Sequence, residues 1–146
     1  MQVKIQILEH GKGLEQLSYA TPGSAGADLM AAVYEDTVIN PQEIKLIPCG
    51  FNIEIPSGYE GQVRSRSGIS SKHGIIVLNS PGTIDSDYRG EIKLILINLS
   101  SEPFIVQRGM RLAQLVISAV QQVDFNVVDR LDETQRAAGG FGSTGI

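Results

Sequence analysis

Hydrophobic and polar residues alternate with a period of two along much of the chain. In "VKIQIL" (3–8), "FNIEIP" (51–56) and "EIKLILIN" (91–98), every second residue is apolar and most of the others are polar. This alternation predicts β-strands that bury one face. The stretches "IIVLN" (75–79) and "RLAQLVISAV" (111–120) also favour strands, although they are apolar on both faces.

Turn-forming sequences separate these stretches at intervals of roughly 8–12 residues, which is typical of an all-β sandwich or barrel. They include "TPGSAG", "NPQE", "PSGYEG", "DYRGE" and "QRGM". Only "SGISSKHG" (67–74) and "LDETQRAA" (131–138) favour a short helical turn, and the second runs directly into glycines. The fold class predicted is therefore all-β.

The composition changes near Leu131, which divides the chain into a strand-rich body (1–130) and a glycine-rich C-terminal arm (131–146). Such an arm is either a frayed end or a segment that docks on another surface. Phe141, alone among the small residues of "GGFGSTG", favours a lid that closes over a ligand. The strands that are apolar on both faces favour oligomerisation.

The composition excludes several classes of protein. A chain of 146 residues with 42% hydrophobic and 19% charged residues suits one globular domain. Its net charge of −4, without a Lys/Arg block, disfavours binding of a nucleic acid polymer but allows a small anionic ligand. No apolar run approaches the ~20 residues that span a bilayer. Together with the single cysteine, Cys49, this favours a cytoplasmic protein without a membrane partner.

The segment "PGTIDSDYRGEIK" (81–93) is the strongest candidate for chemistry. It can be a plain hairpin in which Arg89 pairs with Asp87 or Glu91. A plain hairpin, however, does not need Asp85 directly after an apolar residue and before the turn. A carboxylate at the edge of a strand, partly screened from water, is a suitable general base.

The segment "RSRSGISSKHG" (64–74) supplies donors for an anion. Arg66, Ser67 and Gly68 place a guanidinium, a hydroxyl and an unobstructed backbone N–H side by side, a combination that suits phosphate. The alternative is a polar loop with solvated arginines. Ser67 as a covalent nucleophile has no neighbouring histidine in the sequence to support it.

Two further polar residues are candidates. Asp28, in "AGADLMA", is either a turn residue or a carboxylate that holds waters around a divalent ion. Gln114, in the apolar "RLAQLV", needs a partner, which can be a ligand or a backbone carbonyl. One cysteine and the two isolated histidines, His10 and His73, make no zinc site and favour surface or structural roles.

In this order and spacing, the clusters resemble the homotrimeric deoxyuridine triphosphatases (dUTPases), from about residue 17 to 145. Five motifs carry the resemblance: "GADLMA", "RSGIS", "GTIDSDYRG", "RLAQLV" and "RAAGGFGSTG". The resemblance implies a distorted jelly-roll or β-barrel subunit in a homotrimer. It also implies hydrolysis of dUTP to dUMP and pyrophosphate with Mg²⁺, which limits uracil incorporation into DNA and supplies dUMP for thymidylate synthesis.

The resemblance also implies roles for individual residues. Asp85 would activate the water that attacks the α-phosphorus in line. Asp28 and Gln114 would reach magnesium only through water. The remaining implied contacts are with dUTP, at sites built from three subunits. They involve Arg66, Ser67 and Gly68 for the phosphates, Gln114 for the α-phosphate, Asn79 and the backbone of Gly82, Thr83, Ile84 and Lys93 for uracil, Tyr88 for the deoxyribose, Phe141 for stacking on uracil, and Arg136, Gly142 and Ser143 for the terminal phosphates.

The sequence departs from the family's motifs at a few positions. Ser65 stands where many relatives have proline, and Ala137-Ala138 replace a glycine-containing pair. Either hydroxyl of Ser143-Thr144 can contact the terminal phosphate. Cys49 stands where small polar residues are common and is expected to pack in the interior.

Two alternatives compete with the dUTPase interpretation. A dCTP deaminase on the same fold would need a glutamate on the strand after the third motif, where this chain has Ile95 and no acid after Glu91. A trimeric β-module without activity is also possible, because fold alone does not secure function. The presence of Asp85 argues against it.

Overall fold

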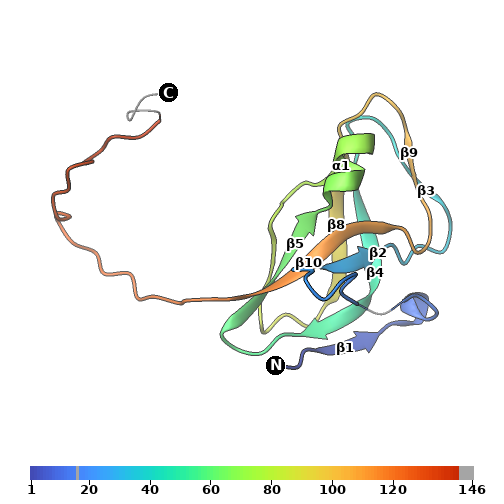
Figure 1. Ribbon diagram of the computed structural model, residues 1–146, viewed down its shortest axis with the longest axis horizontal. Coiled ribbons are helices and arrows are strands. Elements are labelled where there is room, and N and C mark those ends of the chain that lie inside the picture. Colours follow the sequence, from blue (N-terminus) through green and yellow to red (C-terminus); the bar gives the residue numbers. More distant parts are fainter. Residues whose placement is uncertain (16, 142–146) are drawn as a thin grey trace.

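The computed structural model describes residues 1–15 and 17–141, and Figure 1 shows them as a β-rich body with an extended C-terminal segment. The elements, in chain order, are β1 (Lys4–Ile7), the 3₁₀ turn η1 (Glu9–Gly11), β2 (Ala27–Met30), β3 (Thr37–Ile39), β4 (Ile44–Glu54), β5 (Tyr59–Ser65), α1 (Ser67–His73), β6 (Ile75–Val77), β7 (Gly82–Ile84), β8 (Glu91–Asn98), β9 (Phe104–Val106) and β10 (Arg111–Ala119).

The strands form antiparallel sheets around one hydrophobic core. One sheet has the order β1-β4-β8-β6, the second has the order β2-β10-β5-β7, and β3 pairs with β9. The core draws on both four-stranded sheets, with Ile47 and Leu94 from the first and Leu29 and Leu115 from the second, all almost fully buried. The prediction of an all-β, jelly-roll body is therefore confirmed.

The local predictions hold where the period-two pattern is strong. All five predicted strand stretches lie on β1, β4, β6, β8 and β10, and "SGISSKHG" forms α1. The stretch "LDETQRAA" forms turns instead of a helix, with the Ala137 N–H bonded to the Thr134 carbonyl at 3.1 Å. Within the described residues, no helix has the length and apolar character that crossing a bilayer requires.

A bulge interrupts the pairing of β4 with β8. Pro48 pairs with Lys93, but the next pair is Asn52 with Glu91, so β4 carries extra residues between them. Gly50 lies in this bulge with a φ of +77°, a conformation that favours glycine. It packs so closely against η1 that a Cβ on Gly11 would lie 2.0 Å from the Gly50 carbonyl oxygen. The bulge thereby fixes the N-terminal 3₁₀ turn against the sheet.

The segment after β10 leaves the body (Figure 1). The Val120 N–H donates to the Gly58 carbonyl at 2.9 Å, whereas the hydrogen bonds in the described part beyond it join residues at most three apart. Phe125 and Val127 are 92% and 96% exposed, and Phe141 is completely exposed. Large apolar side chains in such numbers on one segment indicate a surface that another element covers.

Candidate active site

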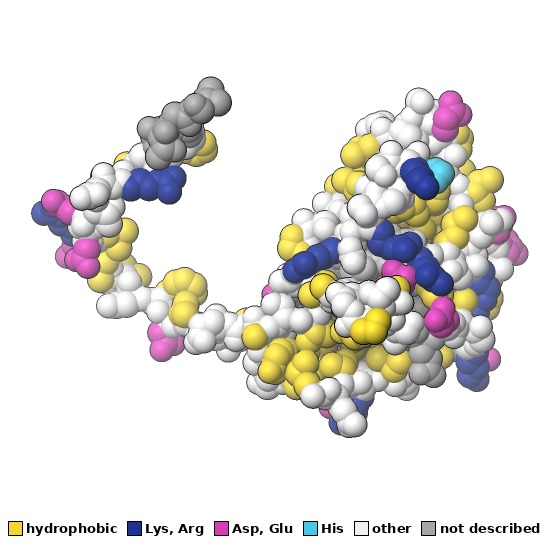
Figure 2. Space-filling model, in the orientation of Figure 1, with side chains coloured by type: hydrophobic (Ala, Val, Ile, Leu, Met, Phe, Trp, Pro, Cys, Tyr) yellow, Lys and Arg dark blue, Asp and Glu magenta, His cyan; other side chains and the backbone are white. Residues whose placement is uncertain are grey.

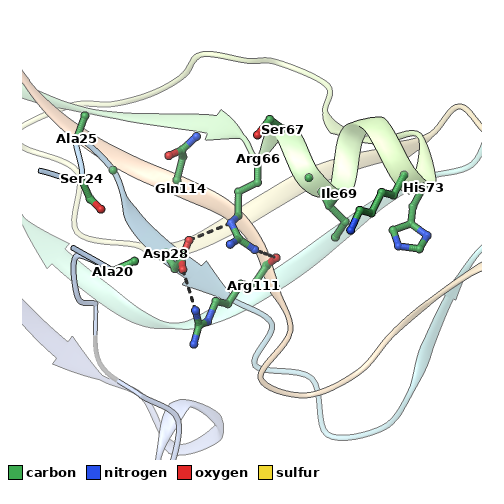
Figure 3. A pocket seen from close by; sticks show the side chains of 13 residues that line it. Ala20, Ser24, Ala25, Asp28, Arg66, Ser67, Ile69, His73, Arg111 and Gln114 are labelled. Carbon is green, nitrogen blue, oxygen red and sulfur yellow. Dashed lines mark hydrogen bonds and ion pairs between the residues drawn. The ribbon is translucent and has the colours of Figure 1, made fainter.

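A cavity of about 520 Å³ lies where β2, β10 and the start of α1 meet, and we call it the arginine cavity (Figure 3). Its walls include Gly26, Asp28, Arg66, Ser67, Gly68, Lys72, Arg111 and Gln114. The arginine cavity is therefore lined by all five residues that the first, second and fourth motifs predicted, namely Asp28, Arg66, Ser67, Gly68 and Gln114.

Strand register explains why these distant segments meet. β10 lies between β2 and β5, with Gln114 opposite Asp28 and Ala113 opposite Ser65. The Gln114 amide donates to the Ser65 carbonyl at 3.1 Å, and a Cβ on Gly26 would lie 2.5 Å from Gln114 Oε1. The glycine of "GADLMA" is needed because the glutamine of "RLAQLV" packs directly on its backbone.

Two arginines share one carboxylate in the arginine cavity. Arg66 Nε lies 3.0 Å from Asp28 Oδ1, and Arg111 Nη1 lies 3.5 Å from Asp28 Oδ2. Arg66 also donates to the Arg111 carbonyl at 2.8 Å. With Lys72 on the same wall, cations outnumber the single carboxylate, and the Arg66 guanidinium is already oriented. The cavity can therefore accept an anion such as a phosphate.

A second hollow, of about 310 Å³, lies beside β7 and the start of β8, and we call it the turn pocket. Its lining includes Asn79, Gly82, Thr83, Ile84, Asp85, Tyr88, Glu91 and Lys93. β7 is held by pairing with β5, with Gly82 opposite Val63. A Cβ on Gly82 would lie 3.0 Å from Asn79 Nδ2, so the glycine lets the Asn79 amide lie close to the strand.

The Tyr88 ring has a defined position beside the turn pocket. Its hydroxyl donates to the Glu91 carbonyl at 3.1 Å, and a Cβ on Gly90 would lie 2.3 Å from the same hydroxyl oxygen. Arg89 donates to the carbonyls of Ser86 and Tyr88, at 2.7 and 2.8 Å, and so braces the turn. The pairing of Arg89 with Asp87 or Glu91, which the plain-hairpin interpretation offered, does not form.

Asp85 follows β7 directly and its side chain is exposed to solvent. It lines both the turn pocket and an adjoining hollow of about 700 Å³ that Glu60 and Asp87 also line. Its carbonyl accepts the Tyr88 N–H at 3.2 Å, which fixes the backbone of the turn. The carboxylate is thus placed at the rim of a pocket, where water can reach it.

The predicted site residues fall into three separate groups in one chain. The arginine cavity and the turn pocket have no lining residue in common among the described residues. Arg136 and Phe141 lie on the extended arm, where Arg136 Nε donates to the Gly139 carbonyl at 2.8 Å. Figure 2 shows Lys and Arg side chains gathered across the body while the arm stands apart. Gly142, Ser143 and Thr144 lie outside the described residues.

Sequence reasoning missed Arg111, Lys72 and Glu91 as lining residues. Lys72 follows Gly68 by four residues on α1, a spacing that places both on one helix face and was readable. Arg111 lies three residues before Gln114 on β10, where strand alternation predicts opposite faces, and a register shift between Arg111 and Ala113 interrupts that alternation. Ser65 has a role that the sequence did not show, because its hydroxyl accepts the Val77 N–H at 2.9 Å. Val77 lines the turn pocket, so Ser65 links the two hollows.

The two lone histidines and the cysteine have defined surroundings. The His73 ring packs on Phe104 with 5.3 Å between ring centroids, and His10 contacts Glu91. Cys49 is buried, as expected for a packing residue. Burial, with a smaller effect of the Glu91 charge, raises the pKa of the Cys49 thiol far above its usual range.

The fold and its two hollows define a class of protein, a β-barrel with a cation-lined cavity suited to a small phosphorylated ligand. Comparison with known proteins gives the particular family. Residues 13–145 match the dUTPase family model. The deoxyuridine 5'-triphosphate nucleotidohydrolase of Wolbachia sp. subsp. Drosophila simulans (strain wRi) is 55% identical over 147 residues, covering 99% of this chain and 96% of that protein.

Two further comparisons agree. The deoxyuridine 5'-triphosphate nucleotidohydrolase of Orientia tsutsugamushi (strain Boryong) is 52% identical over 147 residues, covering 100% of this chain and 99% of that protein. The solved structure of the Staphylococcus bacteriophage 80alpha dUTPase G164S mutant with dUpNHpp has a TM-score of 0.89 at 25% identity and covers 99% of both chains. The chain belongs to the dUTPase family, as its five motifs predicted.

Proposed function

We propose that the chain is a homotrimeric dUTPase that hydrolyses dUTP to dUMP and pyrophosphate at sites shared between subunits. One observation carries the proposal. Among the described residues, the anion cavity and the turn pocket of one chain share no lining residue, whereas a nucleotide needs both functions at one place. Closed symmetry can place the cavity of one subunit against the pocket of its neighbour.

The arginine cavity is the phosphate half of this site. Arg66, Ser67 and Gly68 supply a guanidinium, a hydroxyl and backbone, and Gln114 lies beside them. Arg66 is held by Asp28 before substrate arrives, so little ordering is needed when phosphate binds. Phosphoryl transfer depends mainly on such positioning and on charge neutralisation.

The turn pocket is the nucleoside half. Asn79 and the backbone of β7 offer donors and acceptors that can match the edge of uracil. Cytosine presents a different pattern and would leave buried polar groups without partners, which is a strong basis for discrimination. The Tyr88 ring, braced on the Glu91 carbonyl, forms a wall that leaves no room for a 2′-hydroxyl.

Asp85 is the general base of the proposed reaction. Its carboxylate takes a proton from water while the water oxygen bonds to the α-phosphorus and the bond from that phosphorus to the bridging oxygen breaks. Pyrophosphate leaves, and dUMP remains. The rim position of Asp85 supports this role because the carboxylate reaches both solvent and the pocket.

Magnesium fits the site only through substrate and water. The described residues contain no group of three or more His, Cys, Asp or Glu side chains that could hold a metal. Each Asp28 oxygen faces one guanidinium group, and an ionised carboxylate has further lone pairs that can accept from metal-bound water. Mg²⁺ commonly keeps several waters and binds substrate phosphates. When bound, the ion would neutralise phosphate charge, with Asp28 and Gln114 holding its waters.

The C-terminal arm (131–146) closes the proposed site on a neighbouring subunit. The described part of the arm, 131–141, extends away from its own body and exposes Phe141 completely, which supports a partner surface on another subunit. Phe141 stacks on uracil, and Arg136, with Gly142 and Ser143, contacts the terminal phosphates.

We also propose a cytoplasmic location, because a protein with one buried free thiol suits a reducing compartment.

A nucleotide assay tests the activity. Purified chain with Mg²⁺ is given dUTP, with dCTP, dTTP and UTP as controls, and dUMP and pyrophosphate are measured. We expect efficient release of both products from dUTP alone. Ammonia from dCTP would support the deaminase alternative instead, and intact dUTP would support a module without activity.

A subunit-mixing experiment tests the shared site. Arg66→Ala and Asp85→Asn chains, each inactive alone, are co-expressed and assembled at random. If the arginine cavity and the turn pocket come from different subunits, about a quarter of the sites combine two intact halves and activity returns. No recovery in mixed trimers, confirmed by light scattering and tag pull-down, would place both halves of the site in one chain.

A further inference from the structure

His10 lies in contact with a residue of the turn pocket. Its Nε2 is 2.5 Å from Glu91 Oε1, and the two side chains are only 22% and 15% exposed. Glu91 is part of the lining of the turn pocket. A residue from the N-terminal turn therefore supports, from behind, the pocket that 79–93 builds.

The backbone around His10 is held firmly. The Leu8 N–H donates to the Gly50 carbonyl at 2.9 Å, and Gly11 packs on Gly50 without space for a Cβ. The Arg108 guanidinium donates to the carbonyls of His10 and Lys12, at 2.7 and 2.9 Å. Because the β4 backbone and the Arg108 side chain fix the backbone of this turn, the imidazole reaches Glu91 from a defined position.

Glu91 connects His10 to two residues that line the turn pocket, Lys93 and Tyr88. Its Oε1 also accepts the Gly50 N–H at 3.0 Å, so two donors orient the carboxylate. Its Oε2 lies 3.6 Å from Lys93 Nζ, and its carbonyl accepts the Tyr88 hydroxyl at 3.1 Å. A shift of Glu91 would therefore move the Lys93 side chain and the Tyr88 ring together.

We propose that His10 is a positioning residue for sugar selectivity, acting through Glu91 on Tyr88. The imidazole N–H donates to the Glu91 carboxylate and holds the start of β8, so that the Tyr88 ring keeps its distance from the deoxyribose. This inference rests on the proposed function, in which the turn pocket binds the deoxynucleoside. His10 itself touches neither substrate nor the reacting atoms.

The test compares dUTP with UTP in three variants. His10→Leu removes the donor, His10→Gln keeps an N–H donor of similar reach, and Lys12→Leu changes an exposed side chain on the same turn as a control. We expect His10→Leu to lower the dUTP:UTP ratio of kcat/KM by about 3–10-fold, the value of one hydrogen bond. Most of the change should appear as a higher kcat/KM for UTP, because a displaced Tyr88 ring no longer excludes the 2′-hydroxyl. His10→Gln and Lys12→Leu should keep the ratio within about twofold.

The outcomes separate selectivity from stability and from the proposed function. A lower melting temperature of His10→Leu with an unchanged dUTP:UTP ratio would make the pair merely structural and overturn the inference. If His10→Leu does not fold, Glu91→Leu removes the acceptor from the other side of the same contact and should lower the ratio similarly. Wild-type chain that does not hydrolyse dUTP would reject the proposed function, whereas an active wild type with unaltered variants would reject this inference alone.

Discussion

The arginine cavity and the turn pocket differ in how they are built. The arginine cavity presents charged side chains from three separated segments, and a shared carboxylate, Asp28, orients its arginines. The turn pocket is formed mostly by one continuous segment, 79–93, in which Gly82 and Gly90 let side chains lie against the backbone. Charge can hold any phosphate, but only a shaped backbone can distinguish one base from another. Under the proposed function, we therefore expect the arginine cavity to supply affinity and the turn pocket to supply selectivity.

The largest expected effect belongs to the carboxylate at the rim of the turn pocket. Asp85→Asn should lower kcat for dUTP by ~10²–10⁴-fold while binding of a non-hydrolysable analogue is largely kept, because the amide cannot accept the proton from water. Stopped-flow release of pyrophosphate measures the rate. Asp87→Asn, two residues away in the same turn, is the control and should remain active. Near-normal turnover of Asp85→Asn would remove Asp85 as the base.

Removal of the arm should have the second largest effect. Deleting 136–146 removes Phe141, whose stacking on a base is worth ~1–3 kcal/mol, or roughly 5–150-fold in kcat/KM. The urea midpoint of the body should change little. Among the described residues after Val120, no hydrogen bond reaches the body. Circular dichroism gives the midpoint. A truncated chain with full activity would show that the arm is not a lid.

A pair of substitutions separates the two hollows directly. Arg66→Lys loses the planar donor fork and should weaken dUTP and free pyrophosphate alike, by about 10-fold. Arg64→Lys is the matched control, since the Arg64 side chain bonds to Gln62 and lies outside the arginine cavity. Inhibition by pyrophosphate reports on the phosphate half alone. An Arg66→Lys chain with unchanged pyrophosphate inhibition would contradict the assignment.

Gly82→Ala should weaken binding at the turn pocket, the proposed nucleoside half of the site. Its Cβ would meet Asn79 Nδ2 at 3.0 Å and push the amide aside, so dUTP should bind about 3–10-fold more weakly, the range for one lost hydrogen bond. Pyrophosphate inhibition should stay the same. Titration calorimetry with dUMP and with pyrophosphate measures the affinity for each ligand separately. Equal losses for both ligands would mean that the two hollows are not independent.

The smallest expected effect concerns Cys49, a buried residue whose thiol feels the charge of Glu91. Burial and the nearby Glu91 charge raise the pKa of its thiol, so native chain at pH 8 should not react with a thiol reagent until urea is added. Because folding raises this pKa, the thiol favours the folded state below its unfolded pKa, and that contribution is lost as pH rises further. Rapid labelling of native protein would show that β4 opens near Glu91.

Much of the fold could be read from local pattern. Alternation in "EIKLILIN" predicted β8, and the glycine of "SKHG" ends α1 at Gly74 in a left-handed conformation. The family was readable from five short motifs. The stretch "LDETQRAA" was ambiguous because no apolar face packs it against the body, so turns form there instead.

The sequence by itself determined five of the strands, β1, β4, β6, β8 and β10, and the residues that carry the candidate chemistry, because both depend on neighbours within a few positions. It did not predict β2, β3, β5, β7 or β9. Only the tertiary structure decided that Asp28 orients Arg66 and Arg111, that the site residues divide between separate hollows, and that His10 supports Glu91. The physical reason is that strand pairing joins residues distant in the chain. A period-two pattern identifies a strand's buried face but not the partner or register that will lie beside it.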